Sequence, residues 1–266
     1  MLDFGLTHSA MRIDFFEETP TPNNLAKTAS LGFPSTIYLA SRSLNEFQAL
    51  SASVRGATPA YWAIFSRSYW ISPFSFTDEL ERLLIELQSY AGAPLQVLID
   101  LELPILTPRL FLRNLFRFHK NKQLTARILA LHGTRGLTIA TAEYPAIGVF
   151  SESIKRALGI AYAGSHARIP RYYTSMIRSY TGSLRDFVLP KMRDRIRARN
   201  EAGEAISVGL GATAEGHIGH EQILTAAELE NDLTDLQKIG VGAVTIFRLG
   251  GMTEEHLDVV ARFAHA

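Results

Sequence analysis

Residues 94–102, PLQVLIDLE, form the stretch of sequence from which the fold can be inferred. The run is short and mostly apolar, and Pro104 and Pro108 follow it closely. A helical pattern then extends over residues 110–131. A short buried strand followed by a helix is the unit from which parallel sheets are built.

The same unit recurs about eight times along the chain. Strands are predicted at residues 11–18, 35–40, 60–65, 94–102, 137–143, 160–164, 205–210 and 243–249. A helical pattern follows each strand, although the sixth is followed first by a long connection over residues 165–182. An open, doubly wound sheet would show the same alternation, but no phosphate-binding loop follows the first strand. Eight units in 266 residues therefore predict the α/β class and a single (β/α)8 TIM barrel, one domain over residues 1–266.

Composition excludes several classes of protein. The formal net charge is +1, from 27 basic and 26 acidic residues, so we expect neither a nucleic acid nor a membrane as partner. The chain has no cysteine, which excludes disulfides, thiolate metal ligands and a cysteine nucleophile. The N-terminus lacks a signal-peptide pattern. We expect a cytoplasmic protein unless a signal has been removed, and the oligomeric state is left open.

Asp100 and Glu102 are the strongest chemical feature of the sequence. Side chains alternate along a strand, so these two should point into the barrel with Leu98, while Val97 and Ile99 point outward. Barrel enzymes carry their active sites at the carboxyl ends of the strands. Two enclosed carboxylates repel each other's ionised forms, so one keeps its proton to higher pH, as a general acid requires. Alternatively, both acids form structural ion pairs.

An inward Asp-x-Glu at the end of the fourth strand resembles the catalytic signature of family 18 chitinases and family 25 lysozymes. The resemblance covers little more than this strand and the barrel around it. It implies a glycoside hydrolase acting on a small-molecule or oligosaccharide substrate without a cofactor. It also implies that Glu102 protonates the glycosidic oxygen and that Asp100 supports the substrate's acetamido group as nucleophile.

Two further charged residues end predicted strands. Glu143 ends the fifth strand, so it can approach Glu102 and act as a second catalytic carboxylate; the alternative is an ion pair with Arg135 or Arg168. Arg248 ends the eighth strand. An inward arginine needs a carboxylate partner, either from the site or from an anionic substrate.

Other candidates for substrate binding lie in loops and at strand ends. Flat aromatic rings stack on sugars, although they also anchor loops. The long sixth connection contributes polar and aromatic residues, and long connections are often functional. At the end of the first strand, Glu18 rather than Glu17 is expected to face inward. The binding candidates, besides Arg248, are Glu18, Trp62, Tyr69, His166, Tyr172 and Tyr173.

Two other functions stay open. One is a metal-dependent sugar isomerase, epimerase or lyase, in which Glu102, Glu143 and His166 bind Mn or Mg and Arg248 holds the substrate. The other is a non-catalytic barrel that binds a glycan or a protein. The histidine-containing loop at residues 211–220 has no standard ligand spacing, so no metal site is predicted there.

Overall fold

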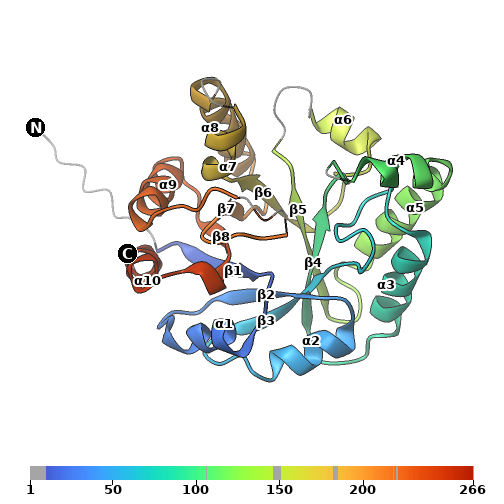
Figure 1. The fold of residues 1–266 in the computed structure, drawn as a ribbon, viewed down its shortest axis with the longest axis horizontal. Coiled ribbons are helices and arrows are strands. Elements are labelled where there is room, and N and C mark those ends of the chain that lie inside the picture. Colours follow the sequence, from blue (N-terminus) through green and yellow to red (C-terminus); the bar gives the residue numbers. More distant parts are fainter. Residues whose placement is uncertain are drawn as a thin grey trace, which may run out of the picture.

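Eight parallel strands close into one barrel in chain order, from β1 to β8 (Figure 1). The structure is a computed structural model that describes residues 10–265 apart from 106, 146–150, 182–184, 218 and 220. The strands are β1 (Arg12–Glu17), β2 (Thr36–Ser41), β3 (Thr58–Ala63), β4 (Leu95–Leu101), β5 (Leu137–Glu143), β6 (Ala167–Tyr172), β7 (Val208–Gly211) and β8 (Ala243–Phe247). The (β/α)8 barrel predicted from the sequence is confirmed.

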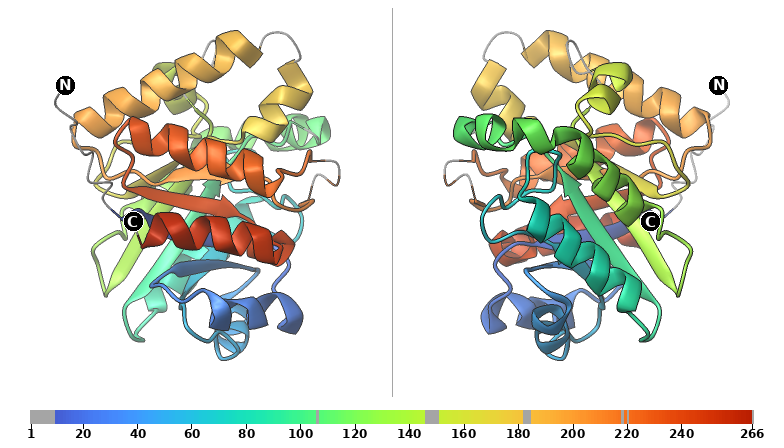
Figure 2. Two further views of the ribbon diagram at one scale, coloured as in Figure 1. Left: turned by 90° about the vertical axis from the view of Figure 1, so that its left-hand side faces the viewer. Right: turned by 90° about the vertical axis from the view of Figure 1, so that its right-hand side faces the viewer.

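Helices surround the barrel on its outside, and α9 and α10 lie side by side (Figures 1 and 2). They are α1 (Pro22–Ala26), α2 (Leu44–Ser51), α3 (Thr77–Ser89), α4 (Pro108–Asn114), α5 (Phe118–Leu129), α6 (Glu152–Ala157), α7 (Thr174–Thr181), α8 (Arg185–Glu201), α9 (Ala226–Lys238) and α10 (Glu254–Ala264), with 3-10 turns η1 (Lys27–Ser30), η2 (Leu115–Arg117) and η4 (Leu249–Gly251). None of the helices in the described part of the chain has the length and apolarity needed to cross a bilayer.

The strands bury one face against the helices and the other inside the barrel. On β4, Val97 and Ile99 belong to the core between strands and helices, whereas Leu98 belongs to the core inside the barrel. This alternation places Asp100 on the interior face, as predicted. β4 and β5 pair in register, with Asp100 opposite Ala142.

The sixth strand is not at residues 160–164, and the prediction there is wrong. Ile160 follows the end of α6, where its backbone N–H donates to Lys155 and Gly159 has a φ of 67°. Such a left-handed glycine commonly ends a helix. The observed β6 and the following α7 lie within the connection predicted over residues 165–182. The sequence pattern did not indicate this strand, because Pro170 cannot donate to the strand ladder and arginines such as Arg168 and Arg171 are seldom buried unless they are paired.

The seventh strand is also displaced from its prediction. It spans Val208–Gly211 rather than residues 205–210, and Ile206 makes only an isolated bridge to Arg168. This shift is small. The carboxyl end of β7 still lies beside the carboxyl ends of its neighbours, because β7 runs parallel to β6 and β8.

Candidate active site at the mouth of the barrel

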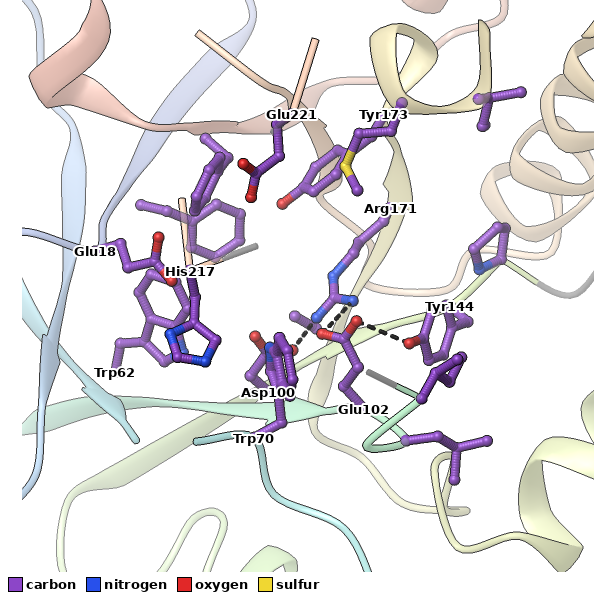
Figure 3. Close-up of a pocket in the computed structure, with 18 of the residues that line it drawn as sticks. Glu18, Trp62, Trp70, Asp100, Glu102, Tyr144, Arg171, Tyr173, His217 and Glu221 are labelled. Carbon is purple, nitrogen blue, oxygen red and sulfur yellow. Dashed lines mark hydrogen bonds and ion pairs between the residues drawn. The ribbon is translucent and has the colours of Figure 1, made fainter. Parts of the chain in front are cut away.

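A cavity of about 470 Å³ opens where the strands end. Its floor and walls come from strand ends distant in the sequence, as Figure 3 shows. Acidic lining residues come from the ends of β1 and β4 and from the loop after β7, and a single arginine of the described lining comes from β6. Rings from β1, β3 and β8 cover the floor, because Phe16, Trp62 and Phe247 belong to the core inside the barrel. This volume lies in the range of roughly 300–1,000 Å³ that is usual for small-molecule sites.

Arg171 holds Asp100 and Glu102 together. Its guanidinium forms an ion pair with Asp100 and another with Glu102, in which Nη1 lies 2.9 Å from Oε2. The hydroxyl of Tyr144 donates to Oε1 of Glu102 at 2.7 Å. The Tyr144 ring also lies 5.5 Å from the guanidinium, close enough for a cation–π contact. Figure 3 shows this group in the middle of the cavity, with Arg171 between the strand ends.

Asp100 keeps its proton to an unusually high pH. Burial raises its pKa to about 7, and the nearby charges of Glu102 and Glu18 act in the same direction. Arg171 acts against them, because its positive charge favours the ionised form. Only 5% of the surface of Asp100 is exposed. A carboxyl group with a pKa near neutrality, inside a cavity, can donate a proton under physiological conditions.

A second acidic pair lines the same cavity. Glu18 and Glu221 both lie in the lining, and burial together with the charge of Glu221 raises the pKa of Glu18. The hydroxyl of Tyr69 donates to Glu18. The ring of Tyr69 stacks on His217, with 3.9 Å between ring centroids and planes 8° apart. The prediction that Glu18 rather than Glu17 faces inward is confirmed.

The predicted aromatic residues divide between the two faces of the strands. Trp62 lines the cavity and Tyr173 lines it from the end of β6. Tyr172 does not, because it follows the opposite alternation and packs in the core between strands and helices. The interpretation of Tyr172 as a cleft residue is therefore wrong.

His166 is also misplaced by the prediction. It was expected after a sixth strand that ended at residue 164, but it precedes β6 and so lies at the amino end of that strand. It is buried, does not line the cavity, and burial lowers its pKa. The displaced strand thus explains the error.

Glu143 faces outward, contrary to the expectation that it approaches Glu102. Ile139 lies four residues earlier on β5 and packs in the core between strands and helices. Because side chains alternate along a strand, Glu143 lies on the same outer face. Its fully buried carboxylate pairs with Lys155 of α6 at 3.1 Å and with Arg168 of β6. These cations hold the pKa of Glu143 below its usual value, against the effect of burial. The ion pair with Arg168, which was the structural alternative, is confirmed.

Arg248 likewise does not point into the barrel. Val244 and Ile246 pack in the outer core, and Phe247 is the residue that turns inward. The Arg248 guanidinium pairs with buried Glu17 at 3.1 Å and donates to the carbonyl of Glu215. It joins the ends of β8 and β1, and its charge opposes the rise in the pKa of Glu18 that burial causes. The prediction that Arg248 points inward and pairs with a carboxylate of the site or of the substrate is therefore wrong, because its carboxylate partner is Glu17, which lies outside the cavity.

Three lining residues were missed as functional candidates: Tyr144, Arg171 and Glu221. Tyr144 could have been identified by extending the alternation of Ala140 and Ala142 beyond β5, since both face the interior. Arg171 was hidden because the sixth strand was misplaced. Glu221 follows a glycine-rich loop with no periodic pattern, so no local signal indicated that it faces the cavity.

The ligand set predicted for a metal-dependent enzyme does not converge. Of its three members, only Glu102 lines the cavity, whereas Glu143 faces the outer layer and His166 lies at the other end of its strand. Within the described ranges, no group of three or more His, Cys, Asp or Glu side chains could hold a metal ion.

The fold is similar to that of known carbohydrate enzymes. The sequence matches no protein-family model, and no curated protein matches it. Among solved structures, it is similar to the glycoside hydrolase domain of PgaB (BpsB) from Bordetella bronchiseptica, with a TM-score of 0.56, 12% identity, and coverage of 96% of this chain and 98% of that one. A GH18 chitinase from Pseudoalteromonas aurantia gives a TM-score of 0.53, 10% identity and coverage of 96% and 99%. A xylose isomerase domain protein from Planctomyces limnophilus gives a TM-score of 0.56 and 11% identity, with coverage of 96% of this chain and 98% of that one. These likenesses, all at 12% identity or less, show the (β/α)8 barrel fold.

Proposed function

We propose that this protein cleaves glycosidic bonds, with Asp100 and Glu102 supplying the acid and base chemistry. The observation that carries the proposal is their arrangement: two carboxylates share Arg171 on the floor of an aromatic-lined cavity, and one of them has a pKa of about 7. Glycosidases commonly need one carboxyl group that is protonated and one that is ionised. The similarity to glycoside hydrolase barrels agrees with this chemistry.

The contacts favour Asp100 as the proton donor. Arg171 pairs with both acids, whereas Tyr144 donates one hydrogen bond to Glu102 and burial raises the pKa of Asp100 to about 7. Asp100 would donate its proton to the leaving oxygen as the bond from the sugar carbon breaks. Glu102 would stabilise the positive charge that develops on the sugar. Water then adds to that carbon and returns a proton to Asp100. The resemblance to family 18 implies the reverse division, with Glu102 as the donor.

A screen of the purified protein against oligosaccharides tests the proposal. Release of new reducing ends from at least one member of the set is expected. Binding without any cleavage would contradict the proposal and favour a non-catalytic glycan-binding barrel. Activity that is lost in EDTA and restored by Mn or Mg would favour the metal-dependent alternative.

The division of roles predicts the direction of the pH dependence. Because the active form carries a proton on Asp100, kcat/KM should fall as pH rises through about 7. The fall should approach about tenfold per pH unit above that value. Initial rates on a cleaved oligosaccharide, measured across this range, provide the check. A value of kcat/KM that keeps rising above neutral pH would exclude Asp100 as the acid.

The same pKa has a consequence for stability that needs no substrate. The folded protein holds a proton on Asp100 that the unfolded chain, with its ordinary pKa of 3.8, has already lost. This group therefore stabilises the fold at low pH, and that contribution disappears as pH rises through about 7. Asp100→Asn should remove this part of the pH dependence in urea denaturation. Parallel curves for the two proteins between pH 4 and 8 would contradict the raised pKa.

A further inference from the structure

One segment of the chain carries positive charge and no acidic residue. Residues 103–142 contain seven lysines and arginines and neither aspartate nor glutamate. The formal net charge of +1 for the whole chain hides this segment, because all the acids lie outside it. Five of the seven cations fall within residues 108–122, PRLFLRNLFRFHKNK, which span α4, η2 and the start of α5.

The helix α4 lies on the outside of the barrel, next to α5 (Figure 1). Its inner side is filled by Leu110 and Asn114, which are both buried, and Nδ2 of Asn114 donates to the carbonyl of Phe74 at 2.8 Å. A surface helix with one buried side ordinarily has a polar side toward solvent. The outer side of this segment does not follow that rule.

Three large apolar side chains project into solvent from α4 and η2. Leu112 is 76% exposed, Leu115 is 54% exposed and Phe116 is 98% exposed. Leu115 and Phe116 follow Leu112 by three and four residues, which is the spacing of neighbours on a helix surface. We call these three residues the apolar patch. Exposed apolar side chains that gather in this way mark a surface that contacts a protein or a membrane.

Three arginines border the apolar patch at intervals of four residues. Arg109, Arg113 and Arg117 are all exposed, and none of them forms an ion pair with another described residue. The acids of α3, which packs against α5, do not neutralise them, because each is paired with a different base. These pairs are Asp78 and Glu79 with Arg67, Glu81 with Lys120, and Glu86 with Arg82.

We infer that this face of the protein docks on an anionic lipid surface, with the apolar patch inserted among the lipids and the three arginines at the headgroups. Leucine and phenylalanine beside arginines form the pattern that binds in the plane of a membrane interface. A bilayer deforms around protruding side chains, whereas a protein partner needs a matching hollow for each of them. A second copy of this chain would bring the same arginines together, and like charges repel. The inference does not depend on the proposed function.

The docking face and the cavity share one connection of the barrel, the connection after β4. Leu103 and Ile105 line the cavity, and α4 begins soon afterwards at Pro108. Ile105 is also 52% exposed. Docking through α4 would therefore bring this part of the cavity lining close to the lipid surface.

Sedimentation with vesicles of two compositions tests the inference. One set contains phosphatidylcholine alone, and the other contains equal amounts of phosphatidylcholine and phosphatidylglycerol. At low salt, the affinity for the mixed vesicles should exceed the affinity for the neutral vesicles at least about tenfold. The affinity for the mixed vesicles should fall as NaCl is added, because salt screens the arginines from the headgroups.

Paired variants separate the apolar and the charged contributions. Leu112→Ser combined with Phe116→Ser should lower the affinity for mixed vesicles at least about tenfold, because less apolar area is removed from water. Arg109→Gln combined with Arg117→Gln should lower it by a similar factor. All four side chains are exposed, so the variants should melt at the wild-type temperature.

Two exposed residues of α8 serve as controls. Phe187 is 62% exposed and Arg195 is also exposed. Phe187→Ser and Arg195→Gln make the same chemical changes outside the docking face, so both variants should bind the mixed vesicles with wild-type affinity.

A fluorescent label reports insertion directly. The chain has no cysteine, so an environment-sensitive dye can be attached at one introduced cysteine. The emission of a dye on Leu115→Cys should shift to shorter wavelength when mixed vesicles are added. The same dye on Phe187→Cys should show no shift.

Four results would overturn the inference. The first is equal affinity for the two kinds of vesicle, or no binding to the mixed ones. The second is wild-type binding by the paired variants, which would place the contact elsewhere. The third is binding to polyglutamate but not to vesicles, which would assign the face to an acidic protein. The fourth is a dimer in solution that leaves vesicles unbound and that Phe116→Ser dissociates, which would show that a second copy covers the apolar patch.

Discussion

Asp100→Asn and Glu102→Gln are each expected to lower kcat/KM by a factor of about 10²–10⁴. Asparagine at position 100 cannot donate an acidic proton to the leaving oxygen. Glutamine at position 102 removes the negative charge that stabilises the developing positive charge on the sugar. Both replacements conserve shape, so Arg171 and Tyr144 keep neighbours of the same size. Rates on the best oligosaccharide of the screen measure the effect.

Two exposed acids serve as controls for these variants. Asp258→Asn on α10 and Glu201→Gln on α8 make the same chemical changes at exposed positions outside the cavity, and their rates should match the wild-type rate. Thermal melting establishes that the cavity variants are folded. Because the two carboxylates act through one guanidinium, the double variant should lose much less than the product of the two single losses. Turnover near the wild-type rate in Glu102→Gln would exclude the mechanism.

Glu143→Gln is expected to lower the free energy of unfolding by about 3–5 kcal/mol. The reason is that Lys155, whose side chain is fully buried, loses the charge of a fully buried partner and keeps only the partly exposed Glu152, at 3.0 Å. Arg168 also contacts Glu143 and is mostly buried. Turnover per folded molecule should remain unchanged, because Glu143 faces the helices and not the cavity. Urea denaturation and a rate measurement on the folded variant check the two halves of this prediction.

An exposed ion pair provides the comparison for Glu143. Glu230 pairs with Arg262 at 2.7 Å, and both side chains are substantially exposed. Glu230→Gln should change the free energy of unfolding by less than about 1 kcal/mol, since exposed pairs contribute little. If Glu143→Gln left the stability unchanged but abolished turnover, Glu143 would belong to the catalytic machinery instead.

The closed barrel and the placement of its main acidic pair could be predicted from local pattern. A strand that is apolar on both faces must be covered on both sides, and the repeat of strand and helix supplies that cover. The alternation of side chains then determines that Asp100 lies on the same face as Leu98, because successive side chains of a strand point to opposite faces of the sheet. Glu18 could be placed by the same argument on β1.

The other charged residues of the site and of the strand ends could not be placed from local pattern, because their positions depend on contacts between strands that are far apart in the sequence. Arg171 is an improbable strand residue until Asp100 and Glu102 lie opposite it, and no local pattern reveals that pairing. The orientation of Glu143 and Arg248 was equally uncertain, since an acid or a base at a strand end can be stabilised on either face. Each found a buried partner, Lys155 and Glu17 respectively, outside the barrel interior.

The sequence by itself determined a closed cylinder with two acids at its mouth, because burial and the period of the strand act on neighbouring residues. Only the tertiary structure decided which cation joins those acids and which acids face the cavity from other strands. Buried charges are stable only beside partners, and in this protein the partners of the central acids come from a strand some 70 residues away in the chain, since Arg171 and Asp100 are 71 positions apart.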